Sequence, residues 1–304
     1  MRASLRILSW NLWHGLNPYQ RYRMSPMQSP REHAERSRDQ IQALVAWSQT
    51  DDEIVCLQEV NPLGRRFEEL GTGIGREGGA CLVNSGIKVG GFGIPRGLRE
   101  GLATFGGAAI SNPSFEQLTL SGGALEVGDG RGDPLLTFQT GERRKALLLE
   151  GMLGDRRVAV INLHLHHGPD TVAENLSRKR AELERLRGWI ESRLERWALV
   201  AVCGDFNCES DSPCLEPLKR MGFGDVMEIA GLKQPPTWDP RENAFALESA
   251  RLADEPETQS WDGATHVFDR IYVRAQGPLE VTDHGIFRQP QLSDHFGVWA
   301  RVGF

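Results

Sequence analysis

The sequence predicts an α/β protein. Short apolar runs rich in β-branched residues recur from one end of the 304-residue chain to the other, a pattern typical of strands. Two longer segments have apolar residues at helical spacing. No linker-like segment or internal repeat divides the chain, so we expect a single domain covering residues 1–304.

The predicted strands are so continuously apolar in places that both of their faces must be buried. They are Leu5–Trp10, Glu53–Gln58, Ala80–Val83, Leu102–Ile110, Ala146–Glu150, Arg157–Leu165, Ala198–Cys203, Phe268–Val273 and Phe296–Val302. The glycine-rich segments Gly71–Gly79 and Ser121–Asp133 and the acidic stretch Glu242–Asp262 are predicted to be loops.

Two amphipathic helices are predicted. The first covers Arg31–Ser48, and the second covers Thr171–Trp197 with Asp170 as its N-cap. The polar face of the second helix carries the run "RKRAELERLR". This run fits a solvated face with i,i+4 ion pairs better than it fits a patch that binds nucleic acid.

Composition narrows the class of protein. Apolar residues make up 39% and charged residues 25% of the chain, as in an ordinary globular protein. The net charge of −6 disfavours a protein dominated by non-specific affinity for nucleic acid, although it allows a local basic groove. No apolar run approaches the ~20 residues that a helix needs to cross a bilayer.

The cysteines and the N-terminal residues indicate in which cellular compartment the protein is expected. The chain has five cysteines and no CxxC pair of the kind that builds a zinc site. The first predicted strand begins almost at Met1, and no secretory signal precedes it. We therefore expect reduced thiols and a cytoplasmic location, and we expect a monomer.

Several predicted strands end in residues that can bind metals or protons. Ala201–Cys208 reads "AVCGDFNC", so a buried strand ends in a glycine followed by Asp205 and Asn207. Similar ends carry Asn11, Gln58, Glu59, Asn162, His164 and Asp269, and Asp294 and His295 immediately precede the last strand. Buried charges need partners or a metal, so we expect these residues to converge on one site at one edge of the sheets.

The motifs at these strand ends, taken in order, resemble those of the endonuclease/exonuclease/phosphatase superfamily. They are "LSWNLWHG", "CLQEV", "INLHLHHG", "CGDFN", "FDRIYV" and "SDH", and they span nearly the whole chain. The resemblance implies a four-layer α/β sandwich, in which two mixed β-sheets lie face to face and are flanked by helices. It also implies Mg²⁺-dependent or Mn²⁺-dependent hydrolysis of a phosphoester, with a diester favoured over a monoester.

Oxygen donors suited to Mg²⁺ or Mn²⁺ are present in Glu59, Asn11 and Asp294. The resemblance assigns the metal contact to Glu59, where a cation polarises the phosphoryl group. Taken alone, Asn11 could instead cap a turn, but the ordered set of motifs favours the site.

The resemblance also assigns the catalytic roles. His295 matches the general base, since imidazole titrates near neutral pH, and Asp269 matches the carboxylate that orients its ring. Asp205 and Asn207 are expected to position the attacking water and the phosphate oxygens. His164 occupies the position from which the family's histidine donates to phosphate.

The substrate stays open between a phospholipid-type molecule, a nucleotide and a nucleic acid. The motifs are closer to the sphingomyelinase-like and uncharacterised bacterial branches than to the apurinic endonucleases. Two departures weaken the transfer of any one substrate: Arg270 stands where many members have tyrosine, and "EGLATFGGAAISN" lacks the usual Ser-Arg. A nuclease and a catalytically silent binding module of the same fold remain as alternatives.

Four further residues near these motifs are less clearly assigned. Strand alternation puts His166 on the same side as His164, where it can support the site, while His167 is expected in a loop. A zinc cluster of these histidines is disfavoured because "HLHHGPD" lacks the Asp-His pair of the metallo-β-lactamase pattern. His14 either flanks the site or packs beside Trp13, and Trp238 either packs in a loop or contacts substrate.

Overall fold

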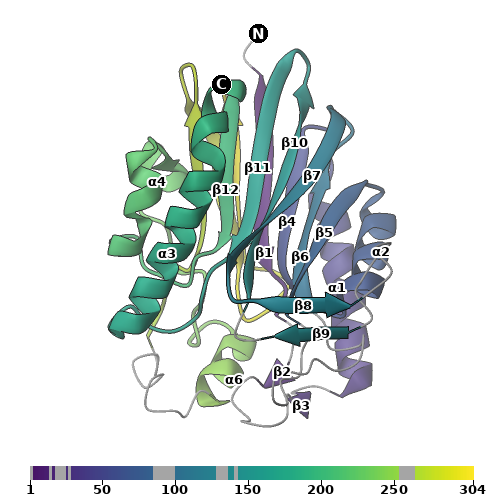
Figure 1. The fold of residues 1–304 in the computed structure, drawn as a ribbon. Coiled ribbons are helices and arrows are strands. Elements are labelled where there is room, and N and C mark those ends of the chain that lie inside the picture. The colour runs from purple at the N-terminus through teal and green to yellow at the C-terminus, as the bar shows by residue number, and fades with distance from the viewer. Residues whose placement is uncertain are drawn as a thin grey trace.

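The computed structural model describes residues 3–13, 16–17, 25–26, 29–84, 100–127, 136–139, 143–252 and 264–304. Within these residues, two six-stranded sheets lie face to face with helices on their outer sides (Figure 1). One outer face is covered by α1 (Pro30–Trp47) and α2 (Leu63–Ile74), and the other by α3 (Ala173–Ile190) and α4 (Glu216–Arg220). The chain thus has the predicted four-layer α/β architecture.

The first sheet has the strand order β15-β16-β1-β4-β6-β5. Its members are β1 (Ser4–Asn11), β4 (Glu53–Val60), β5 (Gly78–Asn84), β6 (Glu100–Gly106), β15 (Glu280–Phe287) and β16 (Gly297–Gly303). Strands β1 and β4 are parallel, with Asn11 opposite Gln58, and β16 is antiparallel to β1. The carboxyl ends of β1 and β4 therefore lie at the same edge as the beginning of β16.

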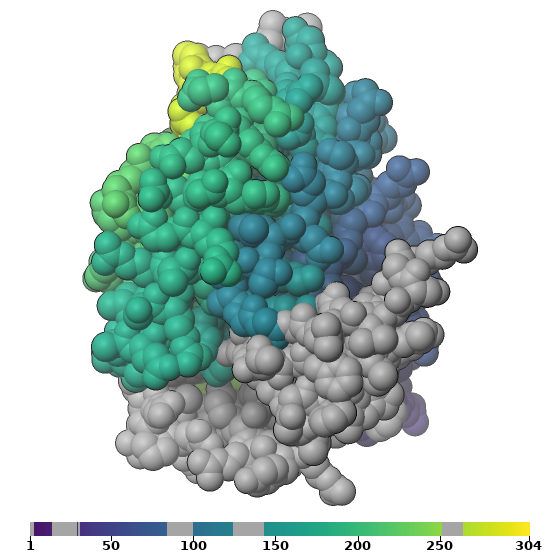
Figure 2. Space-filling view, in the orientation of Figure 1, coloured from purple at the N-terminus to yellow at the C-terminus, as the bar shows by residue number. Residues whose placement is uncertain are grey.

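The second sheet has the order β13-β14-β12-β11-β10-β7. Its members are β7 (Ile110–Ser121), β10 (Arg144–Leu153), β11 (Arg156–His164), β12 (Leu199–Asp205), β13 (Gly224–Asp225) and β14 (Asp269–Ala275). Parallel pairing places His164 opposite Asp205, and antiparallel pairing places Asp205 opposite Asp269. Figure 2 shows the outer side of this sheet, where α3 and β7 lie side by side at the surface.

Shorter elements complete the described chain. They are β2 (Leu16–Asn17), β3 (Ser25–Pro26), β8 (Ala124–Val127), β9 (Leu136–Gln139), α5 (Val226–Ile229), α6 (Ala244–Leu252) and the 3₁₀ helices Glu191–Arg196 and Pro213–Leu215. In Figure 1, β8, β9 and α6 lie at the lower end of the sheets, opposite the chain termini. None of the described helices combines the length and the apolar character required to cross a bilayer.

Alternation along the strands explains their continuous apolar runs. In β1, Ile7 packs in the core between the sheets with residues such as Val160, whereas the next residue, Leu8, packs with Leu44 of α1. Successive side chains point to opposite faces of a sheet, so a strand covered on both faces must be apolar at every position.

A polar contact joins the two sheets beneath the strand ends. The Asn162 side chain in the second sheet donates hydrogen bonds to the carbonyls of Leu57 and Ala103 in the first, both at 3.0 Å. Its oxygen accepts from Gln58 Nε2 at 2.7 Å. Since Asn162 is fully buried, this contact holds the end of β4 against the end of β11.

The structure corrects three predicted boundaries. Leu102–Ile110 is not one strand, because β6 ends at Gly106 and β7 begins at Ile110 after a turn in which the Ile110 amide bonds to the Gly107 carbonyl. Gly71–Gly79 contains the end of α2 and the start of β5. The predicted loop Glu242–Asp262 contains α6, whose first amides bond to the side-chain oxygen of Asn243.

The structure also corrects the N-cap and the end of the second predicted helix, and one more predicted loop. Asp170 is not the N-cap of α3: that position is Val172, which makes no side-chain cap, and Asp170 instead accepts from Lys179 at 2.8 Å. The predicted helix Thr171–Trp197 ends at Ile190 and continues as a 3₁₀ helix. The predicted loop Ser121–Asp133 contains β8, and its residues 128–133 lie outside the described residues.

All five cysteines belong to the described residues. They are free and buried: Cys56, Cys81, Cys203, Cys208 and Cys214.

Gly204 is the glycine of "CGDFN", and its backbone has a φ of 144°. A Cβ at this position would lie 1.9 Å from the carbonyl oxygen of Leu163. We expect Gly204→Ala to lower the free energy of unfolding by at least ~2 kcal/mol, since a strained backbone alone costs ~1–3 kcal/mol. Chemical denaturation measures the change.

Gly188→Ala is the matched control for this substitution. Gly188 lies in α3 with no atom within 4 Å of its ideal Cβ, so alanine is expected to stabilise the helix by ~0.5–1 kcal/mol. A Gly204→Ala variant as stable as the Gly188→Ala variant would contradict the close approach of β11 and β12.

Candidate active site

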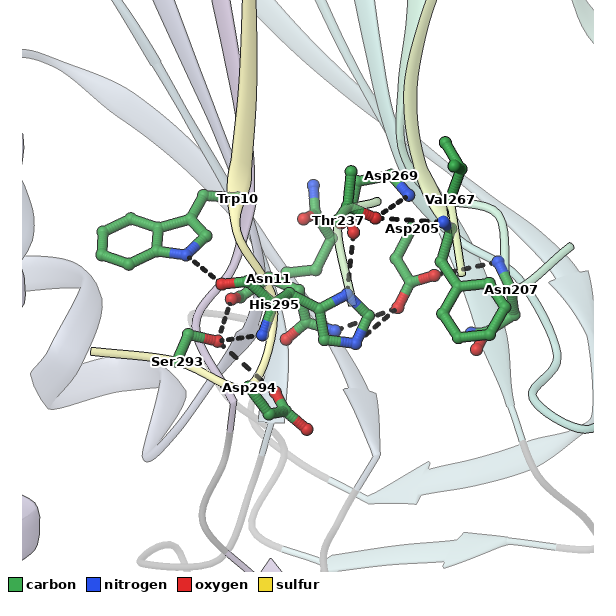
Figure 3. A network of polar contacts seen from close by, with 12 residues as sticks. Trp10, Asn11, Asp205, Asn207, Thr237, Val267, Asp269, Ser293, Asp294 and His295 are labelled. Atoms are coloured by element: carbon green, nitrogen blue, oxygen red, sulfur yellow. Dashed lines mark hydrogen bonds and ion pairs between the residues drawn. The ribbon is translucent and has the colours of Figure 1, made fainter. Parts of the chain in front are cut away.

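The eight site residues predicted from the sequence lie together at one edge of the two sheets. Figure 3 shows six of them, and contacts with Asn11 and Asp205 place the other two, Glu59 and His164, beside them. The first sheet contributes residues at the ends of β1 and β4 and before β16, and the second contributes residues at the ends of β11 and β12 and at the start of β14. They are Asn11, Glu59, His164, Asp205, Asn207, Asp269, Asp294 and His295.

Asp205 connects the two sides of this site. Its Oδ2 accepts a hydrogen bond from Asn11 Nδ2 at 3.0 Å, and it lies 3.5 Å from His164 Nε2 and 3.8 Å from His295 Nε2. Its Oδ1 accepts from the Asn207 amide at 2.9 Å. With 1% of its surface exposed, Asp205 is a buried carboxylate in contact with groups from both sheets.

Burial raises the pKa of the Asp205 carboxyl to about 6, and the negative charge of Asp269 adds to the shift. The charge of His295 and the hydrogen bonds from Asn11 and from the Asn207 amide act in the opposite direction. The net rise shows that the positive charge around Asp205 does not fully compensate its burial.

The imidazole of His295 lies between two carboxylates. Its Nδ1 is 2.8 Å from Asp269 Oδ2, within hydrogen-bonding distance, and its Nε2 faces Asp205. Burial by itself lowers the pKa of His295, but Asp269, Asp205 and Asp294 together hold it well above the ordinary value. This is the arrangement in which one carboxylate orients an imidazole while the other ring nitrogen remains directed into the site.

Asn11 also contacts Glu59 across the first sheet. Its Nδ2 lies 3.2 Å from Glu59 Oε1, and its Oδ1 accepts from the Trp13 amide at 3.0 Å. Glu59 has a φ of 52°, an uncommon conformation for a residue with a side chain. The chain therefore leaves regular strand geometry at this carboxylate, as is frequent at functional sites.

Asp294 is held by hydroxyl groups and lies near an arginine. Its Oδ2 accepts from Ser249 at 2.9 Å. Burial lowers the pKa of Arg36 to about 10, while the negative charges of Asp294 and Glu59 act in the opposite direction. Arg36 therefore supplies positive charge near both predicted metal-binding carboxylates, and it also donates to the carbonyls of Leu12 and Leu292.

Asp205, Asp269 and His295 form a group that could hold a metal ion, with ligand atoms within 4.8 Å of one another. Oδ1 of Asp269 is buried and has no hydrogen-bond partner among the described residues. Neither metal-compatible group in the described part of the chain includes His166 or His167.

The residues left open by the sequence are placed as follows. Trp238 is 3% exposed and packs with Phe268 and Ala246, which matches a packed loop tryptophan rather than an exposed contact. His166 is buried, with its Nε2 3.2 Å from the side-chain oxygen of Asn175 in α3. His14 lies outside the described residues.

Sequence reasoning missed several residues that support the site. Thr237 Oγ1 accepts hydrogen bonds from the amides of Phe268 and Asp269, which places the start of β14. Ser293 Oγ donates to the Asn11 carbonyl at 2.5 Å, which joins β1 to the segment before β16. The only signal for Thr237 was its position beside Trp238, whereas Ser293 stands in the motif "SDH" but had been assigned no role.

Two mixed sheets lying face to face, with polar residues gathered at one edge, define this protein as an α/β sandwich with a candidate active site at that edge. The model of the Endonuclease/Exonuclease/phosphatase family matches residues 8–295, so the chain belongs to that family. The family's name covers nucleases and phosphatases, which hydrolyse phosphoester bonds. Among curated protein sequences, none matches the chain.

Solved structures share the fold at low sequence identity. An endonuclease/exonuclease/phosphatase from Bacteroides vulgatus is 18% identical with a TM-score of 0.62, covering 99% of this chain and 98% of that one. D. rerio TDP2 complexed with a single strand DNA product is 16% identical with a TM-score of 0.60, covering 99% and 100%. Truncated Caenorhabditis elegans TDP2 is 20% identical with a TM-score of 0.59, covering 99% and 97%.

Proposed function

We propose that this protein is a divalent-metal-dependent phosphodiesterase that hydrolyses its substrate by in-line attack of water. The observation that carries the proposal is the position of His295. Its Nδ1 is bound by Asp269 at 2.8 Å, while its Nε2 faces the side of the site formed by Asp205 and Asn11. Proton acceptor, oxygen donors and hydrogen-bond donors thus come from both sheets to one edge.

In the proposed reaction, His295 Nε2 accepts a proton from water as the water oxygen bonds to phosphorus. The bond between phosphorus and the leaving oxygen breaks, and the leaving oxygen takes a proton from solvent. Asp269 orients the ring and stabilises the imidazolium that forms. His164, Asp205 and Asn207 are proposed to orient the phosphate oxygens and the attacking water.

We assign metal binding to Glu59, with Asn11 and Asp294 as further donors. The fit is chemical: these are carboxylate and carboxamide oxygens, which Mg²⁺ and Mn²⁺ prefer. A cation at this edge would also offset the charge of Asp205, whose pKa burial raises to about 6. When bound, such a cation polarises the phosphoryl oxygen and offsets developing negative charge.

The group of Asp205, Asp269 and His295 is better suited to proton transfer than to metal binding. The assignment rests on the geometry of the ring and not on its pKa, because a histidine must be unprotonated both to bind a metal and to accept a proton. The short contact between Nδ1 and Asp269 Oδ2 already engages one nitrogen of the ring.

Nuclease activity is the second candidate. One structure of the same fold, D. rerio TDP2, is complexed with a single strand DNA product. The net charge of −6 disfavours long duplex DNA as the substrate, since non-specific DNA affinity rests on basic surface. A single strand or a short oligonucleotide is therefore the nucleic acid that we include in the test.

We also propose a single-domain monomer that acts in the cytoplasm. The five free, buried cysteines support a reducing compartment.

The proposal is tested by metal removal. Hydrolysis of bis-p-nitrophenyl phosphate is expected to stop in EDTA and to return with Mg²⁺ or Mn²⁺, because the proposed chemistry needs a Lewis acid at Glu59. Full activity in chelator would contradict metal dependence. A protein inactive on this substrate, on a sphingomyelin-type lipid, on oligonucleotides and on inositol phosphates in every metal would instead be the silent binding module.

A further inference from the structure

Lys179 is a charged residue in an unusual place. It lies in α3, within the run that the sequence assigns to a solvated helix face, yet its surface is 0% exposed. A buried ammonium is costly unless hydrogen-bond acceptors or an opposite charge surround it. The contacts of this side chain therefore identify what it stabilises.

The ammonium of Lys179 has three acceptors. It donates to the Gly168 carbonyl at 2.6 Å, to Asp170 Oδ1 at 2.8 Å and to the carbonyl of Asn207. An ammonium carries three N–H groups, so these contacts use its full donor capacity. Two of the acceptors lie in the segment after β11, and the third lies just after β12.

The backbone of Asn207 has a strained conformation that hydrogen bonds must hold in place. Its φ is 50°, in the left-handed region that costs free energy for a residue with a side chain. Its amide donates to Asp205 Oδ1 at 2.9 Å, and its Nδ2 donates to the Leu165 carbonyl at 3.1 Å. With Lys179 on its carbonyl, the amide, side chain and carbonyl of this one residue are all bonded.

Lys179 lies beside a group of side chains that resembles a metal site. Asp170, Cys208 and Cys214 have ligand atoms within 4.8 Å of one another and resemble a metal site. The Lys179 ammonium donates to that same Asp170 carboxylate, so the positive charge at this cluster is supplied by the protein itself.

We propose that Lys179 is a positioning residue of the active site. Its ammonium holds the Asn207 carbonyl and thereby fixes the turn that presents Asp205 and Asn207 to the phosphate. An apolar residue would fill the space but leave two backbone carbonyls without this donor. The inference rests on the proposed function for its catalytic consequence, and on the geometry alone for its effect on the turn.

The test is a double-mutant cycle between Lys179→Met and Asn207→Ala. Lys179→Met is expected to lower kcat on bis-p-nitrophenyl phosphate by ~10–100-fold at saturating Mg²⁺, the range found when a group that orients a site residue is lost. In the Asn207→Ala background the same change is expected to have a clearly smaller effect, because the part that acts through the Asn207 side chain is already lost and only the positioning of Asp205 remains. Equal effects in both backgrounds would show general destabilisation and overturn the proposal.

Arg180→Met is the matched control, because Arg180 is the adjacent, exposed residue of the same helix. It is expected to leave kcat and KM unchanged. If Lys179→Met does not fold, Lys179→Gln replaces it in the cycle. The glutamine amide has two N–H donors for three acceptors, so the kcat of the Lys179→Gln variant is expected to fall several-fold. An unchanged kcat overturns the proposal.

Hydrogen exchange separates this inference from the proposed function. In Lys179→Met, amides of the segment 204–210 are expected to exchange at least ~10-fold faster than in the wild type, while those of β10 keep their rate. An unchanged rate in the segment 204–210 overturns the inference whatever the activity. An inactive wild type refutes the proposed function, and exchange still decides whether Lys179 holds the turn.

Discussion

Replacement of His295 with alanine is expected to lower kcat by ~10²–10⁴-fold, the usual contribution of a positioned general base. The reason is geometric: His295 is the imidazole whose Nδ1 is held by Asp269 at 2.8 Å and whose Nε2 is directed into the site. Steady-state hydrolysis of bis-p-nitrophenyl phosphate in Mg²⁺ measures the effect. The unfolding midpoint of the variant must be recorded, because His295 is buried.

His284→Ala is the control for this variant. His284 lies in β15, the strand at the outer edge of the first sheet, and it has no proposed role in the reaction. Asp269→Asn should show much of the His295→Ala effect, since its carboxylate acts through the same ring. A His295→Ala enzyme within threefold of the wild type would remove His295 from the mechanism.

Glu59→Gln is expected to raise the Mg²⁺ concentration for half-maximal activity by at least ~10–100-fold, the loss found even for residues that only orient a metal ligand. Glutamine keeps the size of the side chain but removes its negative charge, on which affinity for a hard cation depends. Activity titrations with Mg²⁺ and with Mn²⁺, together with calorimetric binding of each metal without substrate, measure the change.

Glu69→Gln controls for the loss of one negative charge. Glu69 lies in α2, where it pairs with the exposed Arg65 and, at 3.8 Å, with Arg66, and it has no proposed role in the reaction. Its metal titration is expected to match that of the wild type. A Glu59→Gln protein with the same metal requirement would mean that the cation binds elsewhere, with Asp205 and Asp269 as the next candidates.

Much of this fold could be predicted from local sequence. Strands covered on both faces must be apolar throughout, so a continuous apolar run such as Ala198–Cys203 is enough to predict a buried strand. The site residues were also predictable as a set. Parallel neighbours such as β11 and β12 end at the same edge of a sheet, so their last residues, His164 and Asp205, meet there.

The edge strand β15 was missed for the opposite reason. Its residues Glu280–Phe287 are mostly polar and partly exposed, so the segment lacks the apolar run by which the other strands were recognised. Only its pairing with β16 makes it a strand. The turn between β6 and β7 was missed because the apolar residues continue on both sides of it.

The sequence by itself determined the class of fold, most of the strands at the centre of the two sheets and which polar residues meet at one edge of them. The tertiary structure alone decided which charged groups support that site. Arg36 and Lys179 lie in helical runs typical of solvated faces, yet both are buried. Whether a charged side chain is buried depends on acceptors far away in the chain, such as the Leu292 and Asn207 carbonyls. Helical periodicity contains no information about contacts at that separation.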